Sequence, residues 1–113
     1  MTVVSVYATF ANAEEAERIG RVLVEERLAA CINILAPCQS IYRWRGEIEA
    51  ADEVPAIMKT SSERVEQLIA RLLELHSYDV PAVAVWPIDK LPAAYGEWVE
   101  RSVRTSPDPL RVS

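Results

Sequence analysis

The side chains that could do chemistry in this chain are few, and long apolar stretches separate them. Six stand out by residue type: Cys31, Asn33, Lys59, His76, Tyr78 and Asp79. A thiol or an imidazole can each act as a ligand. Cys31 and His76 could equally form a nucleophile and its base. Metal contact and covalent catalysis are both open at this point.

Each of these residues also has a purely structural interpretation. Cys31 lies in an apolar run, where a free cysteine is commonly a small buried hydrophobe. His76 closes a predicted helix, where an imidazole can cap backbone carbonyls, and Asp79 could orient the ring. Lys59 could be ordinary surface or a contact for an anionic ligand. The sequence holds one histidine, so a site with several imidazoles would need another subunit.

Length and composition narrow the class of protein. The chain has 113 residues, of which 50% are hydrophobic and 26% charged, and its net charge is −5. These values predict one folded domain and argue against nonspecific binding to nucleic acid or to anionic membranes. No stretch reaches the roughly 18 consecutive apolar residues of a membrane span, and residues 1–10 have the alternation of a strand and not a signal peptide. A cytoplasmic location is therefore expected.

The common catalytic and metal-binding motifs are missing from the sequence. With 3 glycines in all, a phosphate-binding glycine loop is not expected. The spacing of Cys31 and Cys38 matches neither a zinc finger nor a C-x-x-C redox motif, and a disulfide is not expected in the cytosol. Both cysteines are predicted to be free thiols.

The elements that must position these residues begin with a strand and a helix. Residues 3–10 alternate apolar and polar side chains, which predicts a strand with one buried face. Asn12 precedes an amphipathic run with acidic residues in its first turn, which predicts a capped helix. The inner stripe of that helix includes Gly20. Because glycine lowers helix propensity, its presence predicts a close approach of the helix to the sheet.

The middle of the chain is rich in Ile, Tyr, Trp and Val. Two strands are predicted within residues 29–60, with a turn at Arg45 and Gly46. Pro55 lies inside the second of them, and proline is tolerated there only at an edge or a bulge, so this strand is predicted to be irregular.

The C-terminal half predicts two more helices around a short strand. A capping box at residues 60–63 is expected to start a helix that ends near His76. Residues 82–86 form a continuous apolar run, which is typical of a central strand buried on both faces. Residues 93–104 have helical periodicity. Residues 105–113 have the composition of a flexible tail.

The order β-α-β-β-α-β with a C-terminal helix predicts an α+β fold, a ferredoxin-like sandwich with two helices on one face of an antiparallel sheet. Residues 1–104 are expected to form this single domain. The predicted strand and last helix carry more aromatic surface than a small monomer exposes: Tyr42, Trp44, Tyr95 and Trp98. Self-association is therefore expected.

Several motifs, in order and spacing, resemble the CutA divalent-cation tolerance family over about residues 3–104. They are residues 26–34 (ERLAACINI), 40–48 (SIYRWRGEI), 58–60 (MKT), 75–81 (LHSYDVP) and 95–99 (YGEWV), with Glu53 between them. The resemblance implies a ferredoxin-like subunit in a tight trimer with sheet edges joined between neighbours, in the manner of PII-type nitrogen-regulatory proteins. It also implies a link to tolerance of copper and other divalent metals.

The resemblance also implies roles for particular residues. Cys31 and His76 are the expected metal contacts, and six side chains are expected to line a cleft between subunits: Tyr42, Trp44, Glu53, Lys59, Tyr78 and Asp79. The family usually has His-Pro-Tyr-Glu where this chain has residues 76–79 (HSYD), so a looser turn and a shorter carboxylate are expected. Two or three ligands per subunit imply a weak metal site or a shared one.

Together these observations predict a cytoplasmic homotrimer that binds copper, another divalent metal ion or a small ligand between its subunits. No catalysis and no nucleic-acid or membrane partner are expected. Two alternatives stay open. One is a PII-like signalling trimer that binds a small anionic ligand near Lys59 and His76. The other is an enzyme that uses Cys31 with His76.

Overall fold

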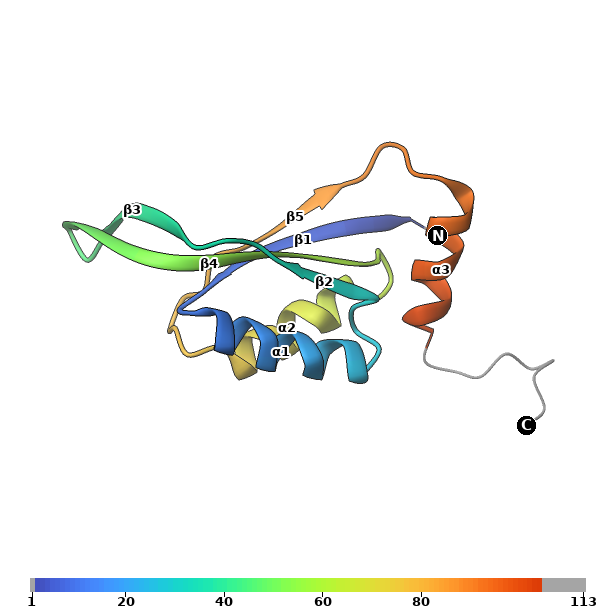
Figure 1. Cartoon of the computed structure of the whole chain (residues 1–113), viewed down its shortest axis with the longest axis horizontal. Helices are drawn as coiled ribbons and strands as arrows, with labels where there is room; N and C mark the ends of the chain where they lie inside the picture. The colour runs from blue at the N-terminus through green and yellow to red at the C-terminus, as the bar shows by residue number, and fades with distance from the viewer. Residues whose placement is uncertain (1, 105–113) are drawn as a thin grey trace.

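A computed structural model describes residues 2–104, and this part of the chain forms a five-stranded antiparallel sheet and three helices (Figure 1). The elements are β1 (Val3–Phe10), α1 (Ala13–Glu25), β2 (Cys31–Ile34), β3 (Cys38–Trp44), β4 (Glu47–Ser61), α2 (Val65–Leu75), β5 (Val83–Pro87) and α3 (Ala93–Ser102). The strand order is β2-β4-β1-β5, and β3 also pairs with β4. The predicted ferredoxin-like α+β fold is confirmed. The predicted tail, 105–113, lies outside the described residues.

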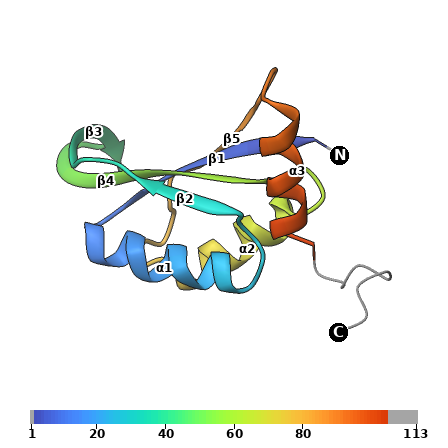
Figure 2. The ribbon, with the colours of Figure 1, turned by 45° about the vertical axis from the view of Figure 1, so that its right-hand side comes forward.

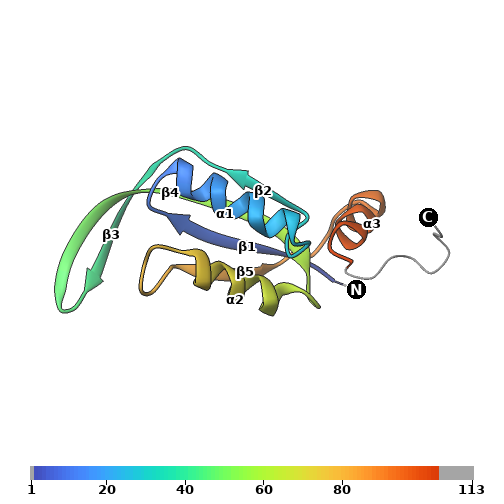
Figure 3. The ribbon, with the colours of Figure 1, turned by 90° about the horizontal axis from the view of Figure 1, so that it is seen from below.

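The main core lies between the sheet and helices α1 and α2, which run side by side beneath one face (Figure 3). Alternate residues of β1 point into it, so Val6, Ala8 and Phe10 are fully buried. From α1, Ile19 and Leu23 meet them and are also fully buried. The predicted inner stripe of α1 therefore covers the predicted buried face of β1.

Gly20 lies where α1 comes closest to the sheet. A Cβ atom at this position would lie 2.8 Å from Cδ1 and 2.9 Å from Cγ2 of Ile32 on β2. Both distances are shorter than van der Waals contact, so glycine is required for this helix to approach the sheet as closely as it does. The prediction made from the cost in helix propensity is confirmed.

Asn12 caps α1 as predicted, and Glu15 extends the cap. The Asn12 side chain accepts the Glu15 N–H at 2.8 Å, and the buried Glu15 carboxylate accepts the Ala11 N–H at 3.1 Å. Its second oxygen accepts the Ser77 N–H at 3.1 Å, from the loop after α2. Burial opposes ionisation, but the hydrogen bonds from Ser77 and Ala11 keep the pKa of Glu15 below its ordinary value of 4.5.

Serine at position 77 gives the turn a hydrogen bond to α1, although the absence of proline predicts a looser turn. The bond from the Ser77 N–H to Glu15 needs a backbone donor that a proline would lack. The turn thus exchanges the stiffness of a proline ring for a charge-assisted hydrogen bond to α1.

The segment between α1 and α2 holds three strands where two are predicted. Residues 35–37 separate β2 from β3, and both strands pair with β4. β4 is 15 residues long and unbroken, so the predicted irregularity at Pro55 is wrong. The Pro55 carbonyl accepts the Leu35 N–H at 2.9 Å, so the proline nitrogen also faces the gap between β2 and β3. A backbone N–H at position 55 would have no strand to bond there, so the sheet tolerates a proline that lacks one.

Helix α2 begins later than predicted. The capping box at residues 60–63 does not form, because Thr60 and Ser61 still belong to β4. The Thr60 hydroxyl instead donates to the Leu28 carbonyl at 2.7 Å. The helix begins at Val65 without a side-chain cap.

The two ends of the sheet differ. At one end α3 crosses the strands and buries Val99 and Val103 in a small second core (Figure 2). At the other, β3 and β4 project beyond the helices as a hairpin, with positive φ at Arg45 and Gly46 as expected for its turn.

The prediction of a central, buried strand at 82–86 is wrong, because β5 is an edge strand and mostly exposed. None of the helices among residues 2–104 is long and apolar enough to cross a membrane.

Gly20→Ala is expected to lower the free energy of unfolding by about 1 kcal/mol, because the overlap with Ile32 outweighs the gain in helix propensity. Gly96→Ala in α3 is the matched control. Its Cβ would lie 3.5 Å from Leu91, an ordinary contact, so it should stabilise the fold by about 0.5–1 kcal/mol. Urea unfolding at one protein concentration measures both changes. Equal stabilisation by the two variants would contradict the close approach at Gly20.

Glu15→Gln is expected to lower the free energy of unfolding at pH 7 by about 2 kcal/mol, because the charged acceptor of two N–H groups is lost. The depressed pKa means that the carboxylate stabilises the fold above pH 4.5 and that this contribution disappears as the pH falls through the lower folded-state pKa. The free energies of unfolding of the wild-type protein and of Glu15→Gln should therefore converge as the pH falls from 7 to 3. Glu14 is exposed on the same turn, so Glu14→Gln is the control and should change the free energy of unfolding little. A difference that does not depend on pH would refute this role.

Candidate functional site

His76 lies at the end of α2 with its ring buried against β1. Its Nδ1 accepts the Tyr78 N–H at 3.1 Å, which assigns the ring proton to Nε2, and Nε2 donates to the Thr9 carbonyl at 2.8 Å. The ring also stacks on Phe10, with 5.1 Å between centroids. Both nitrogens are engaged within the subunit, so the ring has no free lone pair for a metal ion. Its role here is to position Tyr78.

Cys31 lies far from His76 on the sheet. On the neighbouring strand β4 it pairs with Lys59, and Lys59 pairs with Ser5 on β1. Ser5 lies four residues before Thr9, whose carbonyl binds His76. At about 3.3 Å per residue, this register separates the two side chains by about 13 Å along the strands. Metal–sulfur and metal–nitrogen bonds are about 2.0–2.3 Å long. One subunit therefore cannot hold a metal ion, or form a nucleophile and base, with Cys31 and His76 together.

The Cys31 thiol is free and half-buried, and the Tyr95 hydroxyl of α3 lies 3.7 Å from its sulfur. Burial and this contact raise the pKa of Tyr95 to about 12. The phenol therefore stays neutral beside the thiol. Lys59 lies next to this pair and is half-buried.

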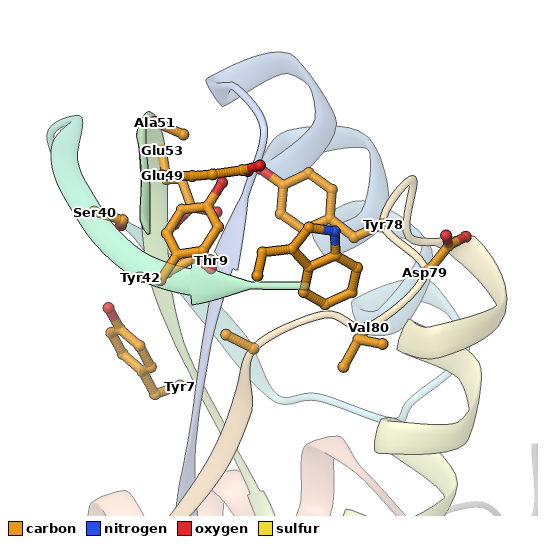
Figure 4. Close-up of a pocket in the computed structure, with 12 residues that line it drawn as sticks. Tyr7, Thr9, Ser40, Tyr42, Glu49, Ala51, Glu53, Tyr78, Asp79 and Val80 are labelled. Carbon is orange, nitrogen blue, oxygen red and sulfur yellow. The ribbon is translucent and has the colours of Figure 1, made fainter. Parts of the chain in front are cut away.

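Five of the six predicted cleft residues meet in one pocket, between the base of the β3–β4 hairpin and the loop after α2 (Figure 4): Tyr42, Trp44, Glu53, Tyr78 and Asp79. The sixth, Lys59, lies outside it, beside Cys31. The pocket has a volume of about 700 Å³, which is the size of a small-molecule site. The remaining lining comes from Tyr7, Thr9, Ser40, Glu49, Ala51, Val80 and Ala82.

The pocket is acidic and aromatic. Three carboxylates line it, those of Glu49, Glu53 and Asp79, and none of the described residues in its wall is Lys, Arg or His. Glu53 is buried, and the Tyr78 hydroxyl donates to it. Burial and this hydrogen bond raise the pKa of Tyr78 to about 12, so the phenol stays a neutral donor. A lining of this charge attracts cations and repels anions.

Thr9 lies on β1 beside the pocket, and its hydroxyl has no hydrogen-bond partner among residues 2–104. Its side chain is part of a residue only 5% exposed, and its Oγ1 has no hydrogen-bond partner within residues 2–104. Leaving a buried hydroxyl unpaired costs about 1–3 kcal/mol, and such groups are rare. Because this oxygen has almost no accessible surface, it is closed off from the pocket and is not a ligand contact.

The carboxylates do not form a ready-made metal site. Among the described residues, no three His, Cys, Asp or Glu side chains are arranged to hold a metal ion. A metal ion in the pocket would need further ligands from water or from a second subunit.

Sequence reasoning missed Tyr7, Thr9 and Glu49, although signals for them exist. Tyr7 and Thr9 alternate with the buried residues of β1 and so face away from the main core. A turn at Arg45 and Gly46 places Glu49 opposite Tyr42 in the hairpin register. The loop residues of the pocket have no such periodic signal.

The comparisons with known proteins agree with this fold. The family model of the CutA1 divalent ion tolerance protein matches residues 4–102. The divalent-cation tolerance protein CutA of Pyrococcus horikoshii is 43% identical over 94 residues, which cover 83% of this chain and 91% of that protein.

Two solved structures are similar throughout. CutA1 from Oryza sativa has a TM-score of 0.89 at 34% identity and covers 94% of this chain and 97% of its own. The periplasmic divalent cation tolerance protein CutA from Archaeoglobus fulgidus has a TM-score of 0.87 at 37% identity and covers 90% and 99%. The resemblance noted in the sequence is thereby confirmed, and the chain belongs to the CutA1 divalent ion tolerance family.

Proposed function

We propose that the protein acts in divalent-cation tolerance as a homotrimer and binds copper or another divalent metal ion in its acidic pocket. The observation that carries the metal proposal is the lining of that pocket, which holds three carboxylates and, among the described residues, no cationic side chain. Carboxylate oxygens bind divalent ions, and copper leads the order of affinity. Because three donors do not converge within residues 2–104 of one subunit, a neighbouring subunit or water supplies the other ligands.

The β3–β4 hairpin supports self-association. Strand side chains alternate, so the side of the hairpin opposite Tyr42 carries Ile41 and Ile48, which are 69% and 61% exposed. At the opposite edge of the sheet, β5 is the last strand, and the Trp86 side chain on it is exposed. Open edges and exposed apolar side chains of this size are usually covered by a partner. A trimer of the PII type would cover them with copies of this chain.

The pocket favours this function over the two alternatives. A small anionic ligand would meet three carboxylates there, and Lys59 lies outside it. An enzyme that uses Cys31 would lack its base, because His76 is engaged elsewhere. We therefore infer that the protein is not an enzyme. We place it in the cytoplasm, where free thiols such as Cys31 persist.

The oligomeric state is tested by light scattering at low micromolar concentration. The wild-type protein is expected at three times its chain mass of 12.7 kDa. Ile41→Asp combined with Ile48→Asp should shift it toward the monomer, because two charges would be buried in the contact. Leu73→Asp, which changes an exposed leucine on α2, is the control and should leave the mass unchanged. A monomeric wild-type protein would refute the trimer.

Metal binding is tested by titrating Cu(II) into the protein in a calorimeter. Glu49→Gln combined with Asp79→Asn should weaken binding by about tenfold or more, because two of the three carboxylates are neutralised. Asp52→Asn is the control, since Asp52 is exposed on the side of the hairpin away from the pocket. Unchanged affinity in the double variant would refute the pocket as the metal site. Cys31→Ser tests the expected metal contact of the Cys31 thiol. Because Cys31 lies outside the pocket, a metal ion bound by this thiol would occupy a second site with its own stoichiometry.

A further inference from the structure

We propose that the acidic pocket binds a protonated primary or secondary amine with an apolar body. Its ammonium group would be held by the carboxylates, and its body by the aromatic rings. This inference rests on the proposed cation-binding role of the pocket and names a class of organic ligand for it. Three features carry it: the distribution of charge, the aromatic lining and the volume.

The arrangement of the carboxylates suits an ammonium group. A divalent metal ion needs ligand atoms that converge at about 2.0–2.6 Å, and among residues 2–104 no three donors do so. An ammonium group needs hydrogen-bond acceptors around it at longer distances of about 2.7–2.9 Å. Glu49 and Glu53 come from the hairpin side of the pocket, and Asp79 comes from the loop opposite with its carboxylate directed away from them, so an ammonium group would be held from the hairpin side.

The aromatic lining suits an organic body. Tyr7, Tyr42, Trp44 and Tyr78 all line the pocket. A hydrated metal ion gains little from these rings, whereas a cation with an apolar body gains both buried area and attraction to the ring faces. Trp44 already receives a cation in this way, since the Arg45 guanidinium lies 5.4 Å from its ring centroid. The volume of about 700 Å³ also exceeds what an ion with a few waters would fill.

Glu53 narrows the ligand to an amine that carries N–H groups. It is buried beside the pocket, accepts from Tyr78 and keeps further lone pairs for an ammonium group. An ammonium N–H can donate to this carboxylate, whereas a fully methylated ammonium group has no hydrogen to donate.

The test uses three probes with one phenyl body, titrated into the full chain by calorimetry. 2-Phenylethylamine should bind, and 3-phenylpropionate, its anionic counterpart, should not. The trimethylammonium analogue, which lacks N–H groups, should bind about tenfold more weakly. Glu53→Gln should weaken the amine by a similar factor and change the trimethylammonium analogue less. Equal affinity for amine and carboxylate, or no effect of Glu53→Gln on the amine, would overturn the inference.

A further variant separates this inference from the metal proposal. Tyr42→Leu should weaken 2-phenylethylamine by about tenfold through loss of ring contact, yet leave Cu(II) affinity unchanged. Trp98→Leu removes an exposed aromatic ring outside the pocket and is the control for both ligands. Cu(II) binding without amine binding would overturn the inference alone. Amine binding without Cu(II) binding would overturn the metal proposal and support the inference.

Discussion

The buried carboxylate of Glu15 is the group on which the geometry of the pocket depends. It accepts an N–H from Ala11 at the start of α1 and another from Ser77 after α2. A buried charge costs several kcal/mol unless it is hydrogen-bonded, and these bonds keep its pKa low. The next residue in this network, His76, binds the β1 backbone and the Tyr78 N–H. One chain of hydrogen bonds thus determines where Tyr78 enters the pocket.

Strand β4 makes the second connection, between the core and the pocket. Its C-terminal part pairs with β1 and β2 and buries Met58 beneath the sheet, and its N-terminal part pairs with β3 beyond the helices. Glu53 stands where the two parts meet, buried and bonded to Tyr78. A cation in the pocket would therefore contact a rigid core strand on one side and the hairpin on the other. The opposite face of the hairpin, with Ile41 and Ile48, stays available to a partner.

Features that depend on nearby residues were predictable. The cap at Asn12 and the close approach at Gly20 follow from positions within one helix, and both are confirmed. The errors arose where a residue's environment depends on distant strands. The proline in β4 is tolerated because β2 and β3 leave a gap beside it, and β5 is exposed because the strand order puts it at an edge. Neither the gap nor the order is encoded in a local pattern.

By itself the sequence determined the fold class, the family and most of the chemistry of the pocket, because motif order and residue type survive without coordinates. Five of the six expected cleft residues lie in that pocket. Tertiary structure alone decided that Cys31 and His76 are far apart and that both nitrogens of His76 are occupied. The reason is physical: distances across an antiparallel sheet depend on strand order and register, and a lone pair is free only if no folded neighbour has taken it.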